Sequence, residues 1–136
     1  MMVSPGEYHQ FLFLVKRITV LQVLLLVLRV DLERLSAAPI KMKEVWVKLL
    51  SNTTAQLEEA LSDAFRQLKQ LGGRIVEVKQ TEHSRNITSQ FRGYLYQDRL
   101  LNEWIKKECT EILESCWNLC GEENLKEGHH FFDKTT

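Results

Sequence analysis

The feature that most constrains this chain is an apolar stretch over residues 11–28, FLFLVKRITVLQVLLLVL, interrupted by Lys16, Arg17 and Gln22. Its longest run without a charged residue covers only 18–28. A helix that spans a bilayer needs about 20 predominantly apolar residues, so this run is short for a span. A segment this apolar must still be buried, either against the rest of the chain or in a membrane.

We expect residues 11–36 to form an apolar N-terminal helix that ends before Pro39, because leucines recur in it at helical spacing. These leucines are Leu21, Leu24, Leu25, Leu28, Leu32 and Leu35. The alternative is a membrane anchor formed by residues 11–28, since tilt and snorkelling of the flanking Lys and Arg side chains would allow a span. A secretory signal is disfavoured because the charged sequence RVDLERLS follows the apolar run.

The remainder of the chain shows alternating and helical patterns in turn. Short alternating stretches predict strands, and the stripe that follows Thr53 and Gln56, a capping-box pair, predicts a helix that stops at Gly72 and Gly73. Asp98 is expected to cap the last helix. The predicted elements are strands over 44–50, 74–82 and 90–97 and helices over 54–71 and 99–120.

This order predicts the α+β fold class, with a three-stranded mixed sheet in βαββα order preceded by the N-terminal helix. The strand–helix–strand unit would make its two strands parallel, and the short connection to the third strand suits an antiparallel hairpin. Both later helices would cover one face of the sheet.

The 136 residues suit one main domain. We expect an apolar helical extension over 1–41, a small α+β domain over 42–120 and a flexible acidic tail over 121–136. A related hypothesis is that Met42 is the natural start and that the extension is dispensable. Lys and Arg equal Asp and Glu at 18 each, so no overall charge directs the protein to nucleic acid or to an anionic membrane.

The alternation of the predicted strands places aromatic and basic side chains together on one face of the sheet. This is the face that the predicted helices over 54–71 and 99–120 leave open. The candidate interaction surface consists of Trp46, Lys48, Lys79, Arg92, Tyr94 and Tyr96. Three interpretations of this face stay open. It is covered by the N-terminal helix as a third layer, it forms a homodimer through its face or edges, or it stacks single-stranded nucleic acid.

The sequence contains no complete catalytic motif. It has neither a GxSxG elbow nor a Gly-rich phosphate loop, because Gly72 and Gly73 are explained as a helix stop. We therefore expect no enzyme activity, no catalytic residues and no cofactor.

Three cysteines, Cys109, Cys116 and Cys120, lie in the last predicted helix without a Cys-x-x-Cys pair. Buried, reduced thiols are favoured over a zinc site with His129 or His130, so no metal is expected. The odd number of thiols favours a reducing, cytoplasmic location, with membrane association as the alternative.

These patterns together predict a non-catalytic interaction or regulatory module that acts through homodimerisation or a protein partner. Binding of single-stranded nucleic acid on the aromatic and basic face is the first alternative. A small membrane-tethered protein, anchored by residues 11–28, is the second.

Overall fold

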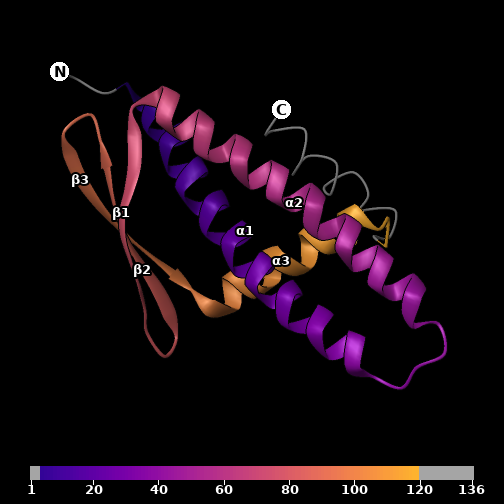
Figure 1. The fold of residues 1–136 in the computed structure, drawn as a ribbon. Helices are drawn as coiled ribbons and strands as arrows, with labels where there is room; N and C mark the ends of the chain where they lie inside the picture. The colour runs from indigo at the N-terminus through magenta and orange to yellow at the C-terminus, as the bar shows by residue number, and fades with distance from the viewer. Residues whose placement is uncertain (1–3, 120–136) are drawn as a thin grey trace.

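The structure, a computed structural model, describes residues 4–119. Two long helices, α1 (Pro5–Ala37) and α2 (Lys43–Leu71), run side by side and are joined by a short loop (Figure 1). Three strands follow, and α3 ends the fold. Their bounds are β1 (Gly73–Gln80), β2 (Ser84–Phe91), β3 (Tyr94–Leu101) and α3 (Asn102–Cys116).

The α+β class and the apolar N-terminal helix are confirmed, but the predicted element order is wrong. The sheet has the order β1-β2-β3 and is antiparallel throughout, so it is not mixed. The elements run helix, helix, three strands, helix, because two helices precede the sheet and no helix connects its strands. The sheet lies on one side of α1, and α2 lies beside that helix (Figure 1).

Residues 44–50 are not a strand; they form the first two turns of α2. The alternation over residues 45–50 that predicted a strand is short, whereas a helical stripe runs without interruption along the whole of α2 and favours the helix. The stripe consists of Trp46, Leu50, Thr53, Leu57, Leu61, Ala64, Leu68 and Leu71. Gly72 ends the helix as predicted, in the left-handed conformation with φ 95°.

The sheet differs from the prediction in its second and third strands. The polar stretch after residue 82, predicted as the connection between the second and third strands, forms β2, and the predicted strand over 90–97 contains a turn at Arg92 and Gly93. Both turn residues have positive φ, 50° and 87°, as a two-residue hairpin loop of type I′ requires. Asp98 therefore lies in β3 and caps no helix, and α3 begins only at Asn102.

Helix α1 supplies half of the buried apolar side chains in the described chain, eight of sixteen. They are Phe11, Leu14, Val15, Ile18, Val20, Leu21, Leu24 and Leu28. Phe11 stacks on Phe91 of β2, with ring centroids 4.6 Å apart and planes 7° apart. The segment predicted as an extension thus packs at the centre of the fold, while the predicted tail over 121–136 lies outside the described residues.

The two charges inside the apolar stretch of α1 are matched by carboxylates of later elements. Arg17 is 7% exposed, and burial lowers its pKa to about 10 while the charge of Asp63 on α2 raises it. Lys16 lies 6.0 Å from the ring centroid of Trp104 and acts electrostatically on Asp98. Burial raises the pKa of Asp98, and the charge of Lys16 lowers it.

By length and composition α1 also meets the requirements for a helix that crosses a membrane. In this fold 61% of its most apolar window is buried inside the protein. A core helix of a globular domain and a membrane anchor both have this length and apolar composition. Anchoring through residues 11–28 therefore stays a prediction.

Candidate functional site

An apolar groove lies at the end of the helical layer that is distant from the turn at Arg92 and Gly93. It has a volume of about 820 Å³ and lies between the end of α1, the first turns of α2 and the end of α3. We call it the helical groove. It is lined by Leu35, Ile40, Trp46, Leu49, Leu50, Cys116, Trp117, Asn118 and Leu119.

One wall of the helical groove is fixed by a hydrogen-bond relay between α3 and α2. The indole Nε1 of Trp117 donates to Oγ1 of Thr53 at 2.8 Å, and the same hydroxyl donates to the carbonyl of Leu49 at 2.7 Å. Thr53 is 3% exposed, so both of its bonds are shielded from water. Thr53 lies inside α2, and its predicted role as a helix cap is therefore wrong; it holds Trp117 in place.

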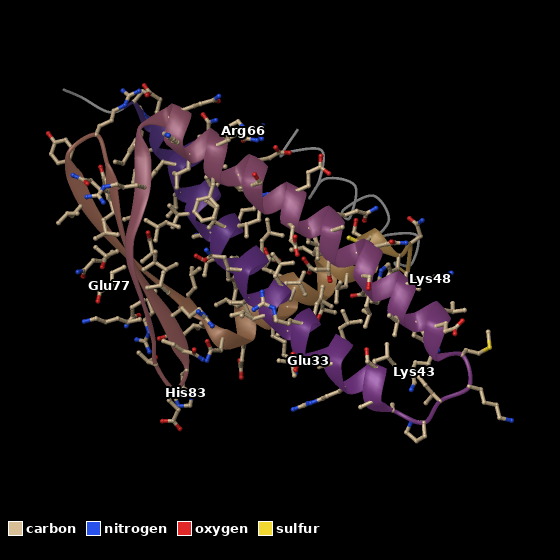
Figure 2. All side chains as sticks on the ribbon, in the orientation of Figure 1. Glu33, Lys43, Lys48, Arg66, Glu77 and His83 are labelled. Atoms are coloured by element: carbon tan, nitrogen blue, oxygen red, sulfur yellow. The ribbon has the colours of Figure 1, made fainter. Side chains whose placement is uncertain are left out.

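The large apolar side chains around the helical groove are accessible to solvent. Trp46 is 50% exposed and Leu119 61% exposed. Soluble proteins rarely leave a contiguous apolar surface of this kind uncovered unless it binds something. Over residues 40–48 the chain also carries three lysines against one acid, Glu44. Two of them, Lys43 and Lys48, project from this end of the molecule (Figure 2).

The thiols of the described chain are poor nucleophiles. Burial raises the pKa of Cys109 to about 11, and its Sγ lies 3.7 Å from the carbonyl of Val20. Burial also raises the pKa of Cys116, which lines the helical groove. A thiolate is the reactive form, so these shifts oppose nucleophilic chemistry. Cys120 lies outside the described residues.

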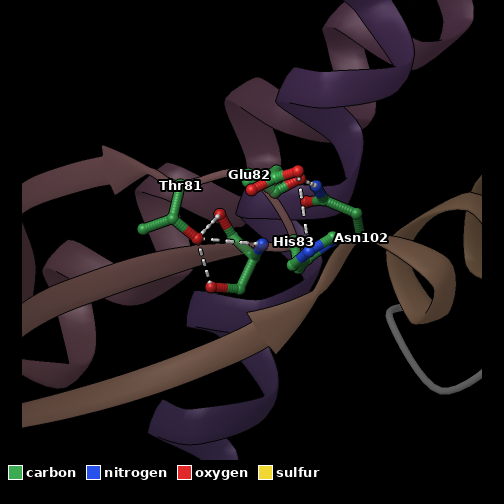
Figure 3. A network of polar contacts seen from close by, with 5 residues as sticks. Thr81, Glu82, His83 and Asn102 are labelled. Atoms are coloured by element: carbon green, nitrogen blue, oxygen red, sulfur yellow. Dashed lines mark hydrogen bonds and ion pairs between the residues drawn. The ribbon is translucent and has the colours of Figure 1, made fainter.

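Within residues 4–119 no group of three or more His, Cys, Asp or Glu side chains is arranged to hold a metal ion. The polar network at the turn between β1 and β2 is explained by the fold itself (Figure 3). Thr81 exchanges hydrogen bonds with Ser84 there, and the side-chain amide of Asn102 donates to the carbonyl of Glu82 at 3.2 Å. This network ties the turn to the start of α3.

A second hollow lies on the sheet; it is lined by polar residues and has a volume of about 480 Å³. Its lining residues are Glu77, Lys79, Asn86, Thr88, Gln97, Asp98 and Arg99. Lys79 and Glu77 form an exposed ion pair at 3.8 Å, and the lining includes no aromatic residue.

The six residues predicted as one interaction surface lie in four different places. Trp46 lines the helical groove, and Lys48 lies on the same helix. Lys79 lines the polar hollow of the sheet. The remaining three lie at the turn of the β2–β3 hairpin or on β3.

Near that turn, Arg92 forms an ion pair with Glu7 and lies 5.4 Å from the ring centroid of Phe91. Tyr96 packs against Tyr8 and Phe11 of α1, whereas Tyr94 is 55% exposed. The stacking surface that the alternation suggested is therefore not assembled from these residues.

Sequence reasoning missed most of the helical groove because its lining comes from three helix ends. A signal was present for the α2 wall, since Trp46 and Leu50 continue the stripe of Leu57 and Leu61 toward the N-terminus. No pattern within one segment could show that Leu35 and Trp117 line the same groove.

The groove and the hydrogen-bond relay both lie within the part of the chain that a protein-family model matches. No curated protein and no solved structure matches the chain significantly. The family model described as YhjD protein matches residues 7–119, from the first turn of α1 to the end of the groove. The chain belongs to the YhjD protein family.

Proposed function

We propose that this protein is a non-catalytic interaction module whose helical groove binds an amphipathic helix of a partner protein. The observation that carries the proposal is the groove of about 820 Å³ lined almost entirely by apolar side chains, with Trp46 half exposed at its rim. Helix-in-groove recognition uses apolar anchors at i, i+3, i+4 and i+7 in such a site.

Two of the lining residues of the helical groove, Trp46 and Trp117, are of a type that contributes strongly to protein binding. Trp46 and Trp117 offer large rigid surfaces, and Trp residues are enriched among the side chains that dominate binding energy. Trp117 already has its Nε1 satisfied by Thr53, so its ring binds an apolar side chain without leaving a polar atom unpaired.

Charge indicates the chemistry of the partner. Lys41, Lys43 and Lys48 stand next to lining residues in the sequence, with Glu44 as the one acid among residues 40–48. A partner helix with acidic residues beside its apolar stripe would match the positive charge of residues 40–48 at the α1–α2 end of the groove, whereas a basic helix would be repelled there. We therefore commit to an apolar helix with acidic flanks as the occupant.

The test is a fluorescence titration of the full chain with two synthetic helical peptides. Both carry leucine at i, i+4, i+7 and i+11; one has glutamates on its flanks and the other has lysines. Because two of the three tryptophans line the helical groove, we expect the acidic peptide to shift the emission to shorter wavelength. The basic peptide is expected to bind at least about tenfold more weakly.

The matched variants are Trp46→Ala and Val45→Ala, neighbours on α2. Val45 is 55% exposed but does not line the groove. Trp46→Ala should weaken binding of the acidic peptide by about tenfold or more, since loss of an anchor costs upwards of about 1.4 kcal/mol. Equal binding by both variants, or no response of the unmodified chain, would refute the proposal.

A further inference from the structure

Strand β1 is an outer strand, and in the described part of the chain no other strand pairs with its free edge. Residues 76–80 of this strand are all exposed, including Val76 at 45% and Val78 at 37%. Natural proteins usually block such an edge, because its unpaired N–H and C=O groups can pair with another strand.

The hydrogen bonds of the adjacent turn show which backbone groups face this edge. The N–H of Thr81 donates to the carbonyl of Ser84 at 2.8 Å, and the register then pairs Lys79 with Asn86. Hydrogen-bonded and non-hydrogen-bonded pairs alternate along an antiparallel ladder. The N–H and C=O groups of Val78 and Gln80 therefore point away from β2, toward the free edge.

We propose that β1 pairs with β1 of a second copy, antiparallel and centred on Val78, to form a continuous six-stranded sheet. In this register each Val78 exchanges two backbone hydrogen bonds with its counterpart. Glu77 of each copy then lies directly opposite Lys79 of the other, in the non-hydrogen-bonded pairs whose side chains approach most closely.

Charge selects this register over its neighbours. Centring the pair on Glu77 would place two glutamates opposite each other, and centring it on Lys79 would oppose two lysines; like charges in directly opposite positions destabilise a sheet. In the Val78 register the four charges alternate in sign. The exposed ion pair of Glu77 and Lys79 within one chain, at 3.8 Å, already shows that the two side chains share one face.

The apolar side of the strand is compatible with the same arrangement. Val78 pairs with Ile87, which is 1% exposed in the core, so Val78 is on the side of the helices but is not covered by them. A twofold axis through the strand pair, perpendicular to the sheet, keeps the helices of both copies on one face. The two Val78 side chains would then cover each other. This surface is separate from the helical groove.

The test exchanges the charges of Glu77 and Lys79 at the joint, by which we mean the proposed contact between the two β1 strands. Association of the full chain is then measured by light scattering and sedimentation. We expect self-association of the unmodified protein. Glu77→Lys or Lys79→Glu alone should weaken it by about tenfold or more, because each places four like charges at the joint. The double variant Glu77→Lys/Lys79→Glu should restore it. A 1:1 mixture of the two single variants should form a heterodimer, since every pair is then complementary.

Glu59→Lys, on an exposed position of α2, makes the same change of charge away from β1 and should associate like the unmodified protein. Thermal unfolding of each variant separates loss of association from loss of folding. A monomer at all accessible concentrations would overturn the proposal, as would single variants that associate like the parent or a mixture that forms no heterodimer.

Discussion

The indole Nε1 of Trp117, just past the end of α3, donates a hydrogen bond of 2.8 Å to Oγ1 of Thr53 in the third turn of α2. These two residues are 64 positions apart, and their bond lies where the helical groove meets the core. It fixes the last turn of the described chain against the helical hairpin. The stability of the groove therefore depends on one buried hydroxyl.

Replacing this hydroxyl tests that dependence. Thr53→Val keeps the shape of the side chain but leaves Trp117 Nε1 without its acceptor, which should cost about 1–3 kcal/mol of unfolding free energy. Thr54→Val is the matched control, because Thr54 Oγ1 donates only to the carbonyl of Leu50, at 2.8 Å. Urea unfolding of both variants provides the measurement. Equal losses would show that the bond to Trp117 contributes nothing specific.

Gly73, at the start of β1 just after α2, is a second position at which the packing of the core restricts the side chain. A Cβ there would lie 2.8 Å from side-chain atoms of both Leu68 and Phe11, which belong to a closely packed core. Gly73→Ala should therefore destabilise the protein by about 1–3 kcal/mol. Gly6→Ala, at a helical position with nothing within 4 Å, should be neutral or slightly stabilising. The measurement is the urea midpoint of unfolding of both variants. A Gly73→Ala variant with the midpoint of the unmodified protein would contradict the close packing around Gly73.

A chain that starts at Met42 tests the predicted boundary at residue 41. It would lack the eight α1 side chains that make up half of the buried apolar set, and the faces of α2 and the sheet would be left open. We expect this chain to show no cooperative unfolding transition by circular dichroism. A soluble, cooperatively folding product would instead support a dispensable N-terminal extension.

Several parts of the fold could be predicted from the sequence because their signals are local. The end of α2 at Gly72 and the helical spacing of the leucines in α1 are signals of this kind. The start of α2 could not be recognised from the six alternating residues 45–50, since tertiary packing overrides the preference of β-branched residues for strands. Strand β2 was hidden because its inward positions include Ser84 and Ser89, 1% and 0% exposed. A polar segment with a single Ile resembles a turn until its neighbours are known.

The candidate site was recognised only in part, for a related reason. Trp46 was assigned to an interaction surface on the assumption that it belonged to a strand, and the structure places it on α2, where it lines the helical groove. Other residues that line the same groove, such as Leu35 and Leu119, come from the ends of other elements. Contacts between helix ends leave no periodic signal in any one segment.

The thiol of Cys109 predicts a pH dependence. Burial raises its pKa from 9.0 to about 11 in the folded protein, so between these values the folded state retains a proton that the unfolded state has released. Stability should therefore fall as the pH rises from about 9 to about 11. The Cys109→Ala variant lacks this contribution. The difference in unfolding free energy between it and the unmodified protein should therefore shrink over that pH range. Parallel curves for the two proteins would exclude the effect.

The central claim is that the helical groove is a binding site, and protection of Cys116 tests it most directly. Cys116 lines the groove, whereas Cys109 does not. The alkylation rates of both thiols are measured by mass spectrometry on the full chain, with and without the acidic leucine-stripe peptide. Occupation of the groove predicts that the peptide slows alkylation of Cys116 by about tenfold and leaves Cys109 unchanged. An unchanged rate at Cys116 under saturating peptide would contradict the account.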